Sequence, residues 1–154
     1  MVSYVLVGRC GLYCGSCMIY RGYKESGKLR KVIAERANCR PDDIRCEGCQ
    51  VVLTEGWNVK GQQWGKNCQI VSCLEAKGLK FCYECRIFPD CDKFREIYDS
   101  QLRHSENLIE NLKRIKAGEV KEWLEEEEKK WTCKKCGKPI SGYEECHWCG
   151  ERLK

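Results

Sequence analysis

Histidine, proline and long apolar runs are scarce in this chain of 154 residues. It has two histidines and three prolines, and no apolar run approaches the roughly 20 residues that a membrane-spanning helix needs. With so few histidines, His-based acid–base catalysis is not expected. The sequence patterns of phosphate-binding loops, dinucleotide folds, serine hydrolases, zinc proteases and zinc deaminases are also missing. These absences argue against the common enzyme classes and against helical membrane proteins.

Cysteine is abundant instead, with fifteen in the chain. The N-terminus lacks the basic start, the apolar stretch and the cleavage site of a secretory signal peptide, so we expect a cytoplasmic protein with reduced thiols. Five C-x-x-C pairs in reduced form indicate metal binding more often than disulfides. The odd number of cysteines points the same way, because complete disulfide pairing would leave one thiol over.

The charge balance is a weaker guide to partners. The formal charge of +5 counts cysteine as neutral, but a zinc ion held by four thiolates carries a charge of about −2, so a few such sites would cancel it. Residues 21–40 contain seven Lys/Arg and two Glu. A solvated helix face is the favoured interpretation. Binding of a protein or nucleic acid, by this stretch or by the C-terminal segment, is the alternative.

The C-terminal segment has the strongest metal signal. Cys133 and Cys136 form one C-x-x-C-G knuckle, and Cys146 and Cys149 form a second after nine intervening residues. Two such knuckles on a short hairpin give tetrahedral coordination with no open position, which predicts a structural β-hairpin zinc ribbon. We expect His147 to point outward. So short a segment has almost no core, so its folding energy would come from the metal.

The N-terminal cysteines are more numerous and harder to pair. The segment Cys10-Gly-Leu-Tyr-Cys14-Gly-Ser-Cys17 supplies three thiols, so a tetrahedral ion there needs a ligand from elsewhere. Cys39 stands apart from any knuckle and is set aside. The other candidate ligands are Cys46, Cys49, Cys68, Cys73, Cys82, Cys85 and Cys91. Ten cysteines do not divide into sites of four, so two are free, or one site has a different ligand, or two ions share a sulfur.

Structural zinc is the first hypothesis for this cluster, and two other chemistries compete with it. An iron–sulfur cluster is the second, because the spacing of Cys10, Cys14 and Cys17 is that of radical-SAM cluster loops. The large barrel of those enzymes does not fit in 154 residues, so a simple cluster-bearing protein is the better form of this hypothesis. A dithiol redox site at Cys14 and Cys17 is the third, but the preceding strand of a thioredoxin-like unit is absent.

The expected architecture is a small, metal-stabilised, α-rich fold in three parts. Residues 1–95 form a cysteine-rich metal-binding domain, residues 96–130 a long amphipathic helix or linker, and residues 131–154 the zinc ribbon. The apolar positions from Phe94 to Ile115 recur at helical spacing and support the long helix. Glu125 to Glu128 are expected on a solvated face. Residues 2–7 suggest a short strand or extended lead-in, and Trp57 and Trp64 are expected to cover the metal core.

Several linked motifs resemble one known family. They are C-G-L-x-C-x-x-C near the N-terminus, C-x-G-C at Cys46, then Cys68 and Cys73, and K-G-L-x-x-C-x-x-C-x-x-F-P from Lys77 followed by Cys91. Together they resemble the cysteine-rich prokaryotic family catalogued as domain of unknown function 3795, with a zinc-ribbon extension. The resemblance implies small cytoplasmic proteins suspected of binding metal, without an assigned activity. Asp90 separates Pro89 from Cys91, unlike the usual family pattern, which leaves open whether Cys91 is a ligand.

The sequence therefore supports two hypotheses. The first is a zinc-binding, non-enzymatic interaction or adaptor protein with a protein or nucleic-acid partner. The second is an iron–sulfur electron carrier or redox sensor that uses the N-terminal cysteines.

Overall fold

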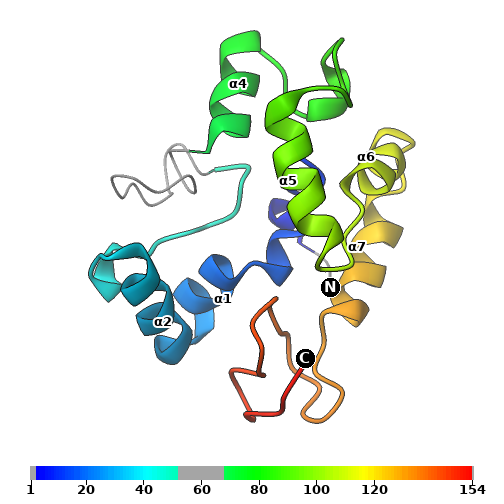
Figure 1. Cartoon of the computed structure of the whole chain (residues 1–154). Coiled ribbons are helices and arrows are strands. Elements are labelled where there is room, and N and C mark those ends of the chain that lie inside the picture. Colours follow the sequence, from blue (N-terminus) through cyan, green and yellow to red (C-terminus); the bar gives the residue numbers. More distant parts are fainter. Residues whose placement is uncertain (1–2, 52–67, 154) are drawn as a thin grey trace.

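The computed structural model describes residues 3–51 and 68–153, and this part of the chain is helical (Figure 1). Short 3-10 turns precede α1 and lie between α2 and α4 and between α4 and α5. The α-helices are α1 (Met18–Glu25), α2 (Gly27–Ala37), α4 (Gln69–Lys77), α5 (Asp92–Leu102), α6 (Leu108–Lys116) and α7 (Val120–Lys130). The 3-10 turns are η1 (Tyr4–Leu6), η2 (Cys14–Ser16), η3 (Pro41–Asp43) and η5 (Cys82–Glu84). None of the described helices is long and apolar enough to cross a bilayer.

Local capping signals set several helix ends. The Ser26 hydroxyl accepts a hydrogen bond from the Leu29 amide at 3.2 Å and starts α2. Asn38 ends α2 in the left-handed conformation (φ 51°), and Gly78 ends α4 in the same way (φ 67°). Both ends suit their residue types, because Asn and Gly adopt this conformation most readily, and Gly27 lies at the break between α1 and α2.

The predicted long helix is wrong, because its apolar stripe is divided among α5, α6 and α7. Ser105, with φ at 62°, lies in the turn after α5, and Asn107 then caps α6 through a 3.1 Å bond to the Glu110 amide. Gly118, with φ at 86°, separates α6 from α7. The turn lets α7 fold back beside α6 (Figure 1), so that Trp123 enters the core edge-on to Tyr13.

The main core joins the N-terminal cysteine segment to α4, α5, α6 and α7. Gly11 shows how closely they pack, because a Cβ there would lie 2.8 Å from the Leu108 carbonyl oxygen of α6. The Gly11 carbonyl also accepts a 2.9 Å hydrogen bond from Asn111. The fully or nearly buried members of this core are Leu6, Val7, Cys10, Tyr13, Cys14, Ile70, Leu74, Cys82, Phe94, Leu108, Leu112, Ile115, Trp123 and Leu124.

The predicted β-hairpin zinc ribbon is also wrong, because the described residues contain no β-strand. Two isolated bridges take its place: one joins Thr132 to Pro139, and the other joins Glu145 to Arg152. Each bridge closes one knuckle on itself, so the two knuckles are not paired along a shared ladder. The short run between the sulfur pairs contains Pro139, which has no amide to donate and limits ladder formation. We call residues 131–153 the C-terminal module.

Tyr4–Leu6 form a 3-10 turn where the sequence suggested a strand or an extended lead-in, and a single bridge joins Val7 to Tyr13. The covering role expected of Trp57 and Trp64 lies outside the described residues.

The acidic run of α7 is not wholly solvated, because Glu127 is buried beside the buried Glu106. The Trp131 indole N–H donates to both carboxylates, at 2.8 Å to Glu106 and 3.2 Å to Glu127. Lys130 and Asn111 also donate to Glu106, at 2.8 and 3.3 Å. Because these donors favour the charged form of Glu106, burial and the adjacent Glu106 carboxylate raise the pKa of Glu127 to about 8.

Replacement of the Glu127 carboxyl should change how the stability of the protein depends on pH. The pKa of Glu127 rises from 4.5 to about 8 on folding, so the folded state binds more protons in this window and the free energy of unfolding falls as pH rises. Between about pH 6 and about pH 9, we expect the free energy of unfolding of Glu127→Gln to rise relative to that of the natural chain by on the order of 1–2 kcal/mol. This value is discounted for the partial solvent contact of the Glu127 side chain. Urea unfolding at both pH values measures this.

The exposed Glu125 on the same helix gives the matched control, Glu125→Gln, for which we expect no such gain. Unfolding free energies that change in parallel with pH for the natural chain and Glu127→Gln would contradict the assignment.

Candidate metal centres

The four cysteines of the C-terminal module meet at one point. Their Sγ atoms all lie within 4.8 Å of one another, with Cys133 at 3.8 Å from Cys149 and Cys136 at 3.7 Å from Cys146. A tetrahedron of sulfur around an ion at about 2.3 Å has edges of about 3.8 Å. Within residues 3–51 and 68–153, no other group of three or more ligand side chains meets this closely. The geometry therefore fits a single four-coordinate metal ion.

The backbone of each knuckle supports thiolate ligands. The Gly137 amide donates to the Cys133 carbonyl at 2.8 Å, and the Gly150 amide donates to the Cys146 carbonyl at 2.9 Å, both glycines having positive φ. This curl turns further amides toward sulfur. The Cys136 amide, with a contribution from that of Lys135, lowers the pKa of Cys133 to about 7. The knuckle thus stabilises the anion that a metal binds.

The C-terminal module lies against α1, α2 and η2 rather than standing apart (Figure 1). The Gly142 amide donates to the Ser16 carbonyl at 2.9 Å, and Lys28 forms an ion pair with Glu145. The expectation that His147 points outward is wrong. Its side chain is 1% exposed, and its Nε2 lies 2.9 Å from a carboxylate oxygen of Glu25. Burial of this ring joins the module to α1.

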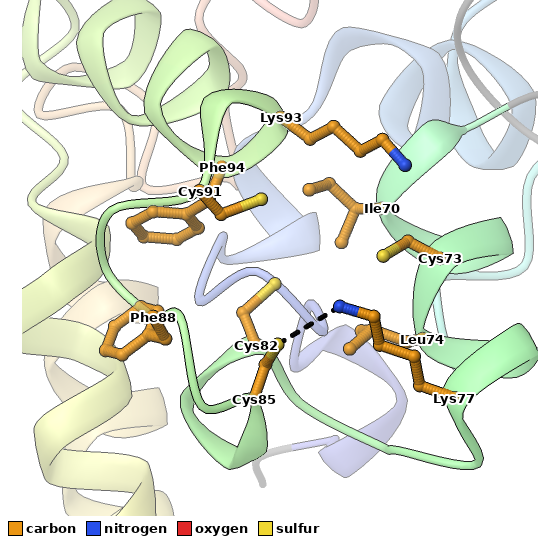
Figure 2. A pocket seen from close by; sticks show the side chains of 10 residues that line it. All are labelled: Ile70, Cys73, Leu74, Lys77, Cys82, Cys85, Phe88, Cys91, Lys93 and Phe94. Carbon is orange, nitrogen blue, oxygen red and sulfur yellow. Dashed lines mark hydrogen bonds between the residues drawn. The ribbon is translucent and has the colours of Figure 1, made fainter.

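Four of the N-terminal cysteines surround a small cavity, which we call the four-cysteine cavity. Figure 2 shows Cys73, Cys82, Cys85 and Cys91 around it, with the Lys77 ammonium 3.2 Å from the Cys85 sulfur. The cysteines come from α4, from η5 and its end, and from the residue that precedes α5. The cavity has a volume of about 20 Å³.

The other six cysteines line a larger space, which we call the six-cysteine cavity. Its volume is about 500 Å³, and its cysteines are Cys10, Cys14, Cys17, Cys46, Cys49 and Cys68. The Cys14 and Cys49 sulfurs are 3.5 Å apart, so the knuckle at 46–49 meets the segment at 14–17. Six sulfurs are two more than a single tetrahedral ion needs. Cys39 lines neither cavity and packs beside a small separate core that includes Ile33 and Ile44.

Burial makes these thiols poor acids unless a cation is present. It raises the pKa of Cys10 and of Cys46 to about 12, and it raises that of Cys82 further. All fifteen cysteines are in the described residues, and none forms a disulfide. The buried sulfurs are therefore stable either as neutral thiols or as thiolates bound to metal.

Lys77 is a site residue that the sequence analysis missed. It lies four positions after Cys73, and residues with this spacing share one face of a helix. That spacing in α4 was a usable signal, since a cation on the face that carries a candidate ligand can balance thiolate charge. His104 is exposed in the turn after α5.

Loss of one ligand should empty the C-terminal module without unfolding the rest. Because the module's own buried core is confined to three residues, we expect Cys149→Ser to lose one metal equivalent and to become cleavable by trypsin around residues 134–138. Elemental analysis and peptide mapping measure both effects. Cys39→Ser is the matched control and should behave like the natural chain; equal metal content in all three proteins would refute the site.

Comparison with known proteins gives one match. The family model described as "Protein of unknown function (DUF3795)" matches residues 6–96, a span that contains all eleven N-terminal cysteines. Searches of curated proteins and of solved structures found nothing similar. The matched span covers more than half of the 154 residues. The chain therefore belongs to the DUF3795 family of proteins of unknown function.

Proposed function

We propose that this protein is a zinc-binding, non-enzymatic interaction or adaptor protein. One observation carries the proposal: the four sulfurs of the C-terminal module have the spacing of a tetrahedral site. Four protein ligands leave no open position for substrate or water, which is the arrangement of structural rather than catalytic zinc. Thiolate ligands in a tetrahedron favour zinc over the harder divalent ions. Such a site requires reduced cysteines, so a cytoplasmic location belongs to the same proposal.

A protein partner is favoured over nucleic acid by the charge of the basic stretch at 21–40. Six of its seven cationic side chains already contact groups of the chain itself. They are Arg21, Lys24, Lys28, Arg30, Arg36 and Arg40. A phosphate backbone would have to compete with these contacts, four of which are ion pairs, with Glu25, Glu47, Glu145 and Asp43. The half-exposed Trp148 of the C-terminal module is an apolar feature that suits a protein surface better.

An iron–sulfur electron carrier or redox sensor is the second candidate function. The six-cysteine cavity favours it, because a volume of about 500 Å³ lined by six sulfurs has room for a polynuclear cluster. The Cys10, Cys14 and Cys17 sulfurs would supply three ligands, and the facing Cys49 is placed to supply another.

Anaerobic purification separates the two candidates. For the zinc protein we expect colourless material with zinc as the metal, including one equivalent in the C-terminal module. Brown protein with absorbance near ~400 nm, acid-labile sulfide and iron would support the second candidate and refute zinc as the metal of the six-cysteine cavity. Elemental analysis of the same anaerobic sample measures the metals directly.

The class of partner has its own test. We expect weak binding of labelled single- and double-stranded oligonucleotides at about 50 mM salt, measured by fluorescence anisotropy. Tight binding that falls steeply as salt rises to about 200 mM would contradict a protein partner, because such a slope reports neutralised phosphates. Lys31→Glu, which alters the basic stretch without removing any of the six contacts above, should leave the weak signal unchanged.

A further inference from the structure

The four-cysteine cavity is formed by consecutive segments of the chain between Ile70 and Phe94. Cys73 lies in α4, and Gly78 then reverses the chain, with the Leu79 amide bonded to the Leu74 carbonyl at 2.9 Å. The Cys82 amide donates to the Arg9 carbonyl at 3.0 Å, which fixes η5 against the N-terminal segment. Backbone hydrogen bonds therefore fix α4 and η5, which form two sides of the cavity.

The start of α5 forms another side of the cavity. Cys91 precedes the first helical residue, and its carbonyl accepts from the Arg95 amide at 2.9 Å. Its sulfur therefore lies at the positive end of a helix of eleven residues, where an anion is favoured. Phe88 and Phe94, with ring centres 5.0 Å apart, line the same cavity on the apolar side. Figure 2 shows the Cys91 sulfur directed toward the space that Cys73 and Cys82 also face.

The charges around the cavity match what a tetrathiolate centre requires. Four thiolates and one divalent ion carry a net charge of about −2. Two lysines, Lys77 and Lys93, line the cavity, and Lys77 contacts the Cys85 sulfur at 3.2 Å. The Ile87 amide also bonds to the Cys85 sulfur. These cations and amides are placed to balance the charge that remains after a metal binds.

The size of the cavity favours one ion over a cluster. Its volume of about 20 Å³ is close to the space that a single water-sized occupant needs. The six-cysteine cavity is many times larger. The two sets of cysteines line different cavities, so the ten N-terminal cysteines that do not divide by four separate into a set of four and a set of six.

We infer that Cys73, Cys82, Cys85 and Cys91 form a second, separate metal centre, which binds one thiophilic divalent ion of the zinc class with Lys77 as its charge-balancing neighbour. This inference goes beyond the proposed function, which rests on the C-terminal module alone. It also gives Cys91 a ligand role despite the intervening Asp90. The C-terminal site and this centre are formed by different residues, so either can fail without the other.

The first experiment measures metal content in the full chain purified without oxygen. We expect Cys73→Ser to contain one zinc equivalent less than the natural chain, while Cys39→Ser keeps the full amount. The double variant Cys73→Ser/Cys149→Ser should lose two equivalents. Unchanged zinc in Cys73→Ser, or loss of iron and sulfide instead of zinc, would overturn the inference. If Cys149→Ser loses one zinc equivalent while Cys73→Ser loses none, the C-terminal site is supported and only the second centre is refuted.

A second experiment uses the natural chain, so it does not depend on a variant that folds. Cys73, Cys85 and Cys91 are only partly buried, as is the comparison thiol Cys39. We expect iodoacetamide to label Cys39 in the native protein and to spare Cys73, Cys85 and Cys91 until a zinc chelator is added, as read by peptide mass spectrometry. If these three are labelled as fast as Cys39 before chelation, no metal is bound there.

Discussion

The close approach of residues 8–14 to helix α6 is the constraint on which the rest of this fold depends. Asn111 of α6 donates to the Gly11 carbonyl at 2.9 Å, and only a residue without a side chain fits beside the Leu108 backbone. The Arg9 carbonyl accepts from Cys82 on the other side. These contacts place Cys10 and Cys82 before any ion is considered. The positions of these two sulfurs are thus set by the packing of the chain itself.

Features set by neighbouring residues could be predicted from the sequence. The ends of α2 and α4 follow from Asn38 and Gly78, because each adopts a conformation that its residue type favours. The four cysteines at 133–149 could likewise be assigned to one point, since each knuckle is a local turn. The family resemblance placed the N-terminal motifs correctly as well.

Features set by tertiary contacts could not be predicted in this way. The spacing of the apolar residues from Phe94 onward does not show how the helices pack, and the placement of Trp123 against Tyr13 depends on the reversal of the chain at Gly118. The division of ten cysteines into sets of four and six depends on how α4 and α5 meet η5. The burial of Glu127 within an acidic run depends on Trp131 and on Glu106, which lies before the start of α6.

Cysteine side chains and apolar side chains pack together in the main core of this protein. Cys10, Cys14 and Cys82 belong to the main core together with Phe94 and Leu112. A small domain gains little from apolar burial alone, and the pKa values of the buried thiols show that their ionisation without a cation is unfavourable. As neutral thiols, these side chains therefore pack as part of the apolar core.

The hydrogen bond from Gly142 to the Ser16 carbonyl connects the two ends of the molecule, since Ser16 lies between Cys14 and Cys17. Together with the contact between His147 and Glu25, it ties the C-terminal module to the turn that carries the buried Cys14. The module therefore restrains a turn that lies far earlier in the chain, and a displacement of the module would release that turn.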